Sequence, residues 1–374
     1  MLKGFTAANP AIATSGTGVA FADYWDKLAT ETAGGSGPDV FRMSMTYFTE
    51  YASRGALRDL TADAASTIDA STLDADVRDS GLVGGKLMGI GQSSIAPALF
   101  SHGGMLQAAG ASVPDEWTWA DFQTWVTDFA KNAGPDKWGT TDLGGNFQMF
   151  DVFARQEVGN QFDPEGKLLL DQAVVEAWYA MWDGLRRGKA APPQDVTAAG
   201  GTFETNPMSK GQAALTAGWV QQVTFFQPLI ADGTVAVSPL PQKVKGDLSG
   251  LFVKALDFWC VSATTKAPEA AAALVDHLIN DSAATKEIGL LLGVPPTGSA
   301  RDQLSSAGGA TTAAIDYVEK VTPKAGKAPG PWPKGYGECL SAFGRANESV
   351  GFGQATPAQA AQTFLSEAKA ALGA

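Results

Sequence analysis

Short apolar runs alternate with longer stretches of helical periodicity along almost the whole chain. The run from Val40 to Met43 follows Pro38 and is typical of a buried strand, whereas apolar residues in 171–187 recur three and four positions apart, as on one face of a helix. A last helix is expected from Thr356, with Pro357 in its first position. This alternation predicts an α/β fold, because successive strands and helices bury their apolar faces against one another in layers.

Length and charge narrow the class of protein. The 374 residues predict about two to three domains of roughly 150 residues each. Lys and Arg total 27 against 39 Asp and Glu, a net charge of -12, which argues against a nucleic-acid binder, because such proteins neutralise phosphates with basic residues. No apolar run approaches the roughly 18 residues of a membrane-spanning helix. We therefore expect a soluble, acidic protein.

Cysteine and histidine are scarce. The chain has two cysteines, Cys260 and Cys339, and two histidines, His102 and His277. A Cys/His zinc site would need three or four such ligands in one place, so no metal site is expected. The two cysteines can form one disulfide in an oxidising compartment or remain as two buried thiols, and the sequence leaves both alternatives open.

The first residues lack the pattern of a signal peptide. Met1 is followed directly by Leu2, Lys3 and Gly4, without a basic segment that leads into a long apolar stretch. The chain as given is therefore expected to be either cytoplasmic or already trimmed.

Familiar catalytic and cofactor motifs are missing from the sequence. Gly84 to Leu87 lacks the spacing and the hydroxyl of a phosphate-binding loop, and Gly89 to Ser94 only begins like a dinucleotide-binding loop. The two histidines are too far apart for H-E-x-x-H, and G-x-S-x-G does not occur. We therefore expect no cofactor and no catalytic residue of these types. A glycosidase needs only two carboxylates at a suitable separation, which leaves that alternative open.

Several aromatic residues lie outside helical periods, at or beside expected loops and strand ends. They are Tyr47, Phe147, Trp219, Trp259, Trp332 and Tyr336. Flat rings next to Gly, Asn, Gln, Ser or Asp suit sugars, because a pyranose presents an apolar face and a rim of hydroxyls. The alternative for each ring is ordinary core packing.

A series of short segments then resembles one known family. In chain order they are FTAANP at 5–10, YWDKL at 24–28, AGGSGPDV at 33–40, GALRDL at 55–60, GKLMGI at 85–90, AGA at 109–111 with WTW at 117–119, KGQAA at 210–214 with GW at 218–219, SATTKAPEAA at 262–271 and VPPT at 294–297. This ordered set is similar to the extracellular solute-binding proteins of ABC importers, in the sugar-binding group (family 1) that includes maltose-binding protein. It covers nearly the whole chain.

The resemblance implies a two-lobed α/β fold of the type II periplasmic-binding-protein kind, with a hinge and a ligand cleft between the lobes. The first lobe is expected to comprise 1–103 and 257–308, and the second 104–256 and 309–374. The implied function is capture of a carbohydrate, an oligosaccharide above all, and its delivery to the transmembrane subunits of an ABC permease. The implied location is the periplasm or the outer face of the cytoplasmic membrane, as a monomer that a lipid can anchor in its full-length precursor.

Site residues follow from the resemblance position by position. The expected ligand contacts are Met43, Ser44, Thr46, Tyr47, Gln92, Ser93, Ser94, Asn146, Phe147, Gln148, Trp219 and Asp257, together with Trp332 and Tyr336 from a late aromatic stretch. In this hypothesis Trp219 and Tyr47 stack on the sugar, and Ser44, Gln92, Asn146, Gln148 and Asp257 bind its hydroxyls.

Three departures from the family qualify this hypothesis. Relatives begin with a strand before the helix that opens this chain, so the first strand of the first lobe is expected to be missing. Ala255-Leu256-Asp257 stands where relatives often have Gly-Gly and an aromatic residue, so a polar ligand contact is expected there. Ser101-His102 stands where a Tyr-Asn pair is common.

Two other functions remain open. A glycoside-active enzyme can use a carboxylate pair such as Asp142 and Asp257. A binder of amino acids or peptides is less favoured, because the charges of such a ligand call for an arginine, and none is among the expected contacts.

Overall fold

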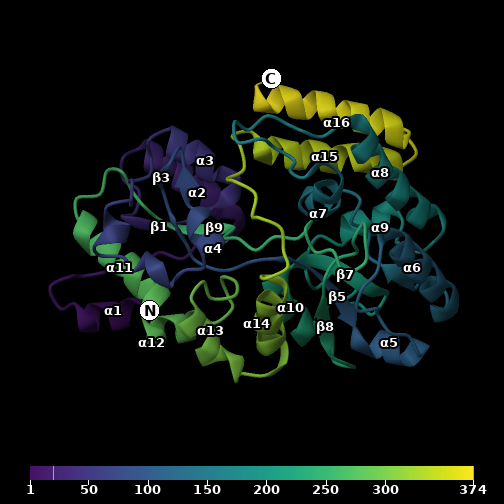
Figure 1. Ribbon diagram of the computed structural model, residues 1–374, viewed down its shortest axis with the longest axis horizontal. Helices are drawn as coiled ribbons and strands as arrows, with labels where there is room; N and C mark the ends of the chain where they lie inside the picture. Colours follow the sequence, from purple (N-terminus) through teal and green to yellow (C-terminus); the bar gives the residue numbers. More distant parts are fainter. Residues whose placement is uncertain (20, 374) are drawn as a thin grey trace. The chain divides into compact units, whose positions relative to one another are not determined.

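The computed structural model describes residues 1–19 and 21–373 and consists of two compact α/β units (Figure 1). Unit 1 comprises Met1–Ser94, Lys254–Ser306 and Gly330–Trp332. Unit 2 comprises Ile95–Val253, Ala307–Pro329 and Pro333–Ala374. The expected α/β class is confirmed.

Unit 1 is built on a three-stranded antiparallel sheet in the order β1-β9-β4. These strands are β1 (Val40–Ser44), β9 (Asp257–Val261) and β4 (Ile90–Gly91). The late strand β9 lies in the middle, where Val40 pairs with Val261 and Ile90 pairs with Trp259. The sheet of unit 1 is therefore completed by a segment far along the chain.

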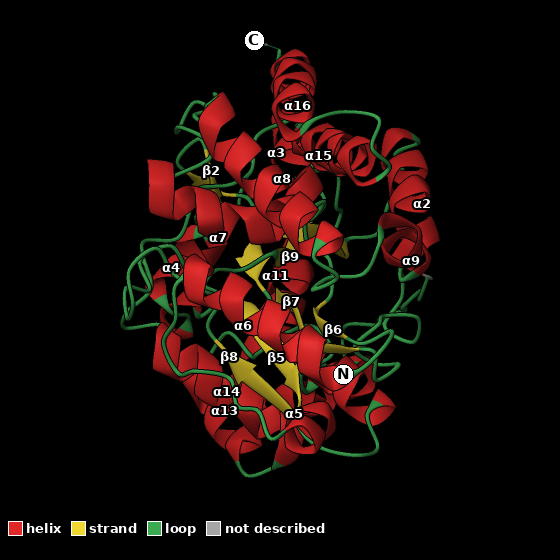
Figure 2. Cartoon of the chain, turned by 90° about the vertical axis from the view of Figure 1, so that its right-hand side faces the viewer, coloured by secondary structure: helices red, strands yellow, loops and turns green. Residues whose placement is uncertain are grey.

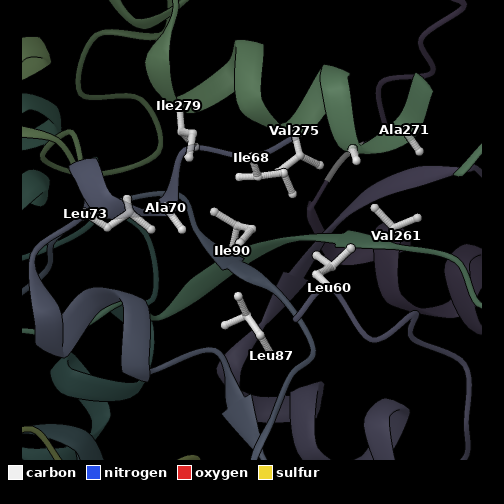
Figure 3. Packing of buried hydrophobic residues seen from close by; sticks show 11 residues of the cluster. Leu60, Ile68, Ala70, Leu73, Leu87, Ile90, Val261, Ala271, Val275 and Ile279 are labelled. Atoms are coloured by element: carbon white, nitrogen blue, oxygen red, sulfur yellow. The ribbon is translucent and has the colours of Figure 1, made fainter. Parts of the chain in front are cut away.

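Helices cover both faces of this sheet. On one face, α11 packs its apolar side chains against Ile90, Val261 and the 60–73 segment (Figure 3). On the other face, Phe48 of α3 stacks on Phe258 with ring centroids 4.2 Å apart.

The remaining elements of unit 1 are short or peripheral. The helices of this unit are α1 (Leu2–Ala8), α2 (Phe21–Ala33), α3 (Met45–Ser53), α4 (Ala75–Asp79), α11 (Pro268–Asn280), α12 (Ser282–Ile288) and α13 (Gly298–Ser305), with two 3-10 turns, η1 (Asp63–Ala65) and η2 (Ala70–Thr72), and a hairpin of β2 (Leu82–Val83) and β3 (Lys86–Leu87).

Unit 2 is built on a four-stranded mixed sheet in the order β6-β7-β5-β8 (Figure 2). The strands are β6 (Trp138–Thr140), β7 (Ala213–Trp219), β5 (Pro97–His102) and β8 (Val235–Ser238). Strand β7 runs parallel to β6 and antiparallel to β5, and β5 also pairs antiparallel with β8. Every residue of β5 is buried, so side chains on both faces of this strand are covered.

The helices of unit 2 enclose an aromatic core. Figure 1 shows the long C-terminal pair α15 (Tyr336–Gly351) and α16 (Pro357–Leu372) side by side, and both contact α8 (Gln172–Arg187). Fully buried rings from α7, α8 and α15 meet beneath them, among them Phe150, Trp178 and Phe343. The other helical elements are α5 (Gly103–Ala109), α6 (Trp119–Ala133), α7 (Phe147–Val158), α9 (Gln194–Ala199), α10 (Val223–Phe226) and α14 (Gly309–Val321), with η3 (Val220–Gln222) and η4 (Gln227–Leu229).

The first change of unit lies after Ser94, whereas the sequence led us to expect it after residue 103. The reason is β5, which hydrogen-bonds β7 and β8 on its two sides and so belongs to the sheet of unit 2. The later changes lie after Val253 and after Ser306, where residues 256 and 308 were expected, and Gly330–Trp332 lies in unit 1 although the expected second lobe included it. Among the residues that the structure describes, no helix combines the length and apolar character needed to cross a membrane.

Candidate functional site

The end of β1 and the start of α3 bring four of the expected contacts together in unit 1. Ser44 ends the strand and caps the helix, where its hydroxyl accepts a hydrogen bond from the Thr46 amide at 3.3 Å. Thr46 and Tyr47 are partly exposed in the first turn. Met43 has no exposed surface, so its side chain belongs to the core rather than to a ligand site.

Tyr47 belongs to an aromatic group at this corner of unit 1. Its ring centroid lies 4.9 Å from that of Trp25, which in turn lies 4.9 Å from Tyr24 at nearly a right angle. Such edge and tilted contacts hold rings in fixed orientations. Tyr47 is therefore a preformed platform that keeps part of its surface exposed.

Asp257 lies opposite Ser44 on β9 and forms an ion pair with Arg42. The Arg42 Nη2 to Asp257 Oδ2 distance is 2.8 Å, and 16% of the Asp257 side chain is exposed. Burial raises the pKa of Asp257, and the charge and hydrogen bond of Arg42 work in the opposite direction. Our sequence analysis missed Arg42, because residues 215 apart in the chain give no local signal of pairing.

The segment that follows β4 has buried polar side chains without partners. Gln92, Ser93 and Ser94 are 5%, 0% and 0% exposed. Their backbone is held firmly, since the Gln92 amide donates to the Asp257 carbonyl at 3.1 Å and the Ser94 amide donates to the Val294 carbonyl at 2.7 Å. In the described part of the chain, however, Gln92 Nε2 and Oε1, Ser93 Oγ and Ser94 Oγ have no hydrogen-bond partner.

This concentration of unsatisfied atoms is costly. A buried polar group without a partner costs about 1–3 kcal/mol, and here four such atoms occur in three consecutive residues. In a site whose polar groups hydrogen-bond the hydroxyls of a ligand, those groups lack partners in the free protein, which destabilises it by this amount. Gln92–Ser94 are as fully enclosed in this structure as Met43, so a ligand's hydroxyls can satisfy these atoms only when the surrounding side chains move aside.

In unit 2, the start of α7 presents two polar residues on either side of a buried ring. Asn146 caps the helix, and its Oδ1 accepts a hydrogen bond from the Met149 amide at 3.1 Å. Gln148 is partly exposed. Phe147 and Tyr336 are each 1% exposed, and their ring centroids lie 5.6 Å apart. Both rings are therefore packed in the core of unit 2, which was the alternative to a ligand contact for each of them.

A buried ion pair holds the loop that leads into α7. Arg186 Nη1 lies 2.7 Å from Asp142 Oδ2, with 5% and 0% of their side chains exposed. The Gly144 amide donates to Asp142 Oδ1 at 2.8 Å, and Trp178 Nε1 donates to the Gly144 carbonyl at 2.9 Å. Asp142 is thus a structural residue that holds the turn at Gly144, ahead of α7. Our sequence analysis missed its partner Arg186.

Trp219 ends β7 and remains partly exposed. Its amide donates to Gln222 Oε1 at 3.0 Å, which fixes the turn into η3. Its ring lies 6.3 Å from that of the buried Phe252, in an edge-on arrangement. Trp219 is therefore the expected aromatic contact of unit 2 that still offers surface to a ligand.

Trp332 and Trp259 are largely occupied with contacts inside unit 1. Trp332 is 4% exposed, and the ammonium of Lys254 lies 5.7 Å from its ring centroid. The Trp332 carbonyl accepts a hydrogen bond from the Thr49 hydroxyl at 2.6 Å. Trp259 packs against the core beneath α11. Trp259 stabilises unit 1 from strand β9, and Trp332 does so from the last short segment of that unit.

The two cysteines carry free thiols and are both buried. Cys260 lies on β9 in unit 1, and Cys339 lies on α15 in unit 2. Burial raises the pKa of Cys339 to about 12 and also raises that of Cys260 well above its ordinary value. In this structure each unit holds one buried free thiol, and the disulfide stays a prediction.

Both histidines make contacts within their own units. His102 caps α5, where its Nδ1 accepts a hydrogen bond from the Met105 amide at 3.2 Å, and burial lowers its pKa. His277 lies beside the ring of Phe5 on α1, with centroids 5.4 Å apart. Within residues 1–19 and 21–373, no group of three or more His, Cys, Asp or Glu side chains can hold a metal ion.

Comparison with known proteins identifies the family of this chain. The sequence model of the bacterial extracellular solute-binding protein family matches residues 1–285, and this chain belongs to that family. The family 1 extracellular solute-binding protein of Alicyclobacillus acidocaldarius is similar in structure, with 29% identity, a TM-score of 0.78, and coverage of 99% of this chain and 93% of that one.

Two further solved structures share the fold and contain sugars. One is an ABC substrate-binding protein of Listeria monocytogenes in complex with cycloalternan, with 24% identity, a TM-score of 0.80, and coverage of 100% of this chain and 94% of that one. The other is a periplasmic oligogalacturonide-binding protein of Yersinia enterocolitica in complex with saturated digalacturonic acid, with 20% identity, a TM-score of 0.83, and coverage of 99% and 95%. The family and the two-lobed α/β fold implied by the sequence resemblance are thus confirmed.

Proposed function

We propose that this chain is the substrate-binding protein of an ABC importer that captures an oligosaccharide and passes it to the transmembrane subunits of a permease. The observation that carries the proposal is the set of four buried, unpartnered polar atoms in Gln92–Ser94. Membership of a family of extracellular solute-binding proteins supports the transport role, and the sugars bound to the Listeria and Yersinia relatives support the ligand class.

A sugar matches the chemistry of these residues. Its hydroxyls both donate and accept, so they can satisfy the amide of Gln92 and the hydroxyls of Ser93 and Ser94 together. Its apolar ring face suits the partly exposed rings of Tyr47 and Trp219. In the proposed complex, polar contacts also come from Ser44, Thr46, Asn146, Gln148 and Asp257, whereas Met43, Phe147, Trp332 and Tyr336 support the site from the core.

The proposed role is binding rather than hydrolysis. A glycosidase requires one carboxylic acid that donates a proton and a second, charged carboxylate. Asp142 and Asp257 are each engaged in an ion pair with an arginine, and the Asp142 side chain has no exposed surface, so Asp142 cannot contact a sugar in this structure. We propose a location in the periplasm or at the outer face of the cytoplasmic membrane, as a monomer that is peripheral to the membrane or lipid-anchored.

The test is a ligand screen with product analysis. The purified protein is mixed with neutral and acidic di- to tetrasaccharides, and with amino acids as controls, and its melting temperature is recorded. A ligand that binds only the folded state raises the melting temperature. The proposal requires a stabilising sugar that chromatography recovers unchanged. Recovery of hydrolysis products, or stabilisation by amino acids alone, would contradict it.

Replacing Gln92 with leucine should stabilise the free protein and weaken sugar binding at the same time. Leucine has a similar size and removes two buried polar atoms without partners, so we expect the free energy of unfolding to rise by about 1–2 kcal/mol. The dissociation constant should rise at least about tenfold, since one lost hydrogen-bonding group is worth about 1.4 kcal/mol or more. Urea unfolding and titration calorimetry measure the two effects.

Gln161 provides the matched control for this substitution. It is 3% exposed, both of its polar side-chain atoms lack partners, and it is not among the proposed contacts. Gln161→Leu should therefore stabilise the protein and leave the affinity unchanged. If Gln92→Leu binds sugar as tightly as Gln161→Leu does, Gln92 is not a ligand contact.

Replacing Trp219 with alanine should raise the dissociation constant for the sugar about 10- to 100-fold, because it removes the stacking surface of unit 2. Trp219→Phe should recover part of the affinity. Trp125 on α6 is the matched control, since it is also a partly exposed tryptophan of unit 2 and packs against Phe129 with ring centroids 5.2 Å apart. Calorimetry should show wild-type affinity for Trp125→Ala. Equal affinity of the two alanine variants would remove Trp219 from the site.

A further inference from the structure

Two segments that pass from one unit to the other are hydrogen-bonded to each other. The first connection, 250–254, and the second connection, 326–332, both contain a boundary between the units. On the unit 2 side of these boundaries, the Gly326 amide donates to the Leu251 carbonyl at 2.9 Å. Because the two connections are far apart in the sequence, this bond is a product of the fold and ties one connection to the other.

A buried arginine holds both connections within unit 2. Arg155 of α7 is 9% exposed, and its guanidinium donates to one carbonyl in each connection. The distances are 3.1 Å from Nε to the Gly250 carbonyl and 2.8 Å from Nη2 to the Lys327 carbonyl. The guanidinium also lies 5.4 Å from the centroid of the Phe252 ring. Because its N–H groups form a rigid planar fork, this side chain fixes the two segments in one geometry.

A buried lysine links the two connections within unit 1. Lys254 belongs to the first connection and has no exposed surface. Its ammonium donates to the Gly330 carbonyl of the second connection at 3.0 Å and also contacts the Trp332 ring. The bond from the Thr49 hydroxyl to the Trp332 carbonyl attaches the second connection to α3 as well. In each unit, therefore, one buried cation links the two connections to each other.

Both cations lie on or beside elements that carry proposed ligand contacts. Arg155 lies on α7, whose start has two of these contacts, and the Phe252 ring that its guanidinium contacts lies 6.3 Å from the Trp219 ring. Lys254 leads into β9, whose first residue is the proposed contact Asp257. Within each unit, a shift of the ligand contacts therefore reaches both connections through packed and hydrogen-bonded groups.

We propose that Arg155 and Lys254 are positioning residues, which make the two connections bend together and so strengthen the binding of a ligand that they do not touch. Connections that bend independently allow the free protein more arrangements of its two units. Binding then has to remove this extra freedom, and the cost in conformational entropy weakens the affinity. The effect on affinity rests on the proposed binding function, whereas the coupling between the connections does not.

Hydrogen exchange of the ligand-free chain tests the coupling. Lys254→Met keeps an unbranched side chain and removes the ammonium, whose bond to the Gly330 carbonyl lies in unit 1. If the connections are coupled, the loss reaches the Gly326 amide in unit 2, and the exchange of this amide should become at least about fivefold faster. Lys254→Gln has a side chain as long as that of the methionine variant but keeps a donor, so it should recover part of the protection.

Titration calorimetry tests the effect on affinity. The probes are cycloalternan and saturated digalacturonic acid, the sugars in the complexes of the two relatives. For a probe that the wild type binds, Lys254→Met and Arg155→Lys should each raise the dissociation constant about 5- to 50-fold. Arg155→Lys keeps the charge but replaces the fork by a single ammonium, which cannot hold both carbonyls in the same geometry.

Tyr179→Phe is the matched control for the loss of a buried donor. The Tyr179 hydroxyl donates to the Phe343 carbonyl at 3.0 Å, within unit 2 and outside both connections. This variant should therefore keep the wild-type affinity and the wild-type exchange of Gly326.

Two results would overturn the proposal. The first is wild-type exchange of Gly326 in Lys254→Met, and the second is wild-type affinity of both Lys254→Met and Arg155→Lys. If the wild type binds neither probe, the failure concerns the proposed function for these sugars, and the exchange of Gly326 alone decides on the coupling. If Lys254→Met does not fold, Lys254→Gln and Arg155→Lys undergo the same two measurements, with the same results required.

Discussion

Replacing Asp142 with alanine should lower the free energy of unfolding by about 3–5 kcal/mol. The reason is that Arg186 keeps its charge in the core of unit 2 with 5% of its side chain exposed, and alanine removes the carboxylate that compensates it. Asn347 cannot replace that carboxylate, because it supplies a single amide oxygen 3.2 Å from Arg186 Nη1. Guanidinium unfolding followed by tryptophan fluorescence measures the change.

Two further variants separate this explanation from a general effect of lost charge. Asp142→Leu combined with Arg186→Met removes both members of the pair, and the double variant should recover most of the lost stability. Glu367→Ala breaks the exposed pair with Arg345, whose side chains are 44% and 62% exposed, and it should cost less than about 1 kcal/mol. If the double variant is as unstable as Asp142→Ala, the buried charge is not the cause.

Phe343→Ala should cost about 3–5 kcal/mol, because it leaves a cavity at the centre of the aromatic core. The ring of Phe343 is fully buried, and its centroid lies 4.9 Å from those of Phe150 and Tyr179 and 5.0 Å from those of Phe147 and Phe364. Denaturant unfolding and near-ultraviolet circular dichroism should both show the loss.

The control for Phe343 comes from the end of the same helix. Phe352 follows α15 and is 53% exposed, so Phe352→Ala should change the free energy of unfolding by less than about 0.5 kcal/mol. A similar loss for both variants would indicate that any phenylalanine is needed in this region and that the core packing around Phe343 is not special.

Local features of the fold could be predicted from the sequence because their causes lie within a few residues. The Thr118 hydroxyl accepts from the Asp121 amide and the Asp121 carboxylate accepts from the Thr118 amide, which is the capping box that the sequence indicated. Gly84 and Gly85 have φ angles of +58° and +78° and turn the hairpin between β2 and β3. Such angles favour glycine, so the dipeptide alone identifies the turn.

The site could be predicted only in part, because exposure depends on residues far away in the sequence. Tyr47 and Trp219 keep exposed surface, whereas Phe147 and Tyr336 are enclosed by rings from α7, α15 and α16. Nothing near these four positions in the sequence distinguishes the two outcomes. The same holds for Arg42 and Arg186, whose partners are 215 and 44 residues away.

The central position of β9 in the sheet of unit 1 determines when this unit can fold during synthesis. Residues 1–94 include the edge strands β1 and β4, but the strand that joins them begins only at Asp257. At about 5–20 residues per second, a ribosome needs roughly 10 to 30 seconds to make the intervening segment. During that time the two early strands lack the strand that joins them, so the sheet of unit 1 cannot be completed until β9 has left the ribosome.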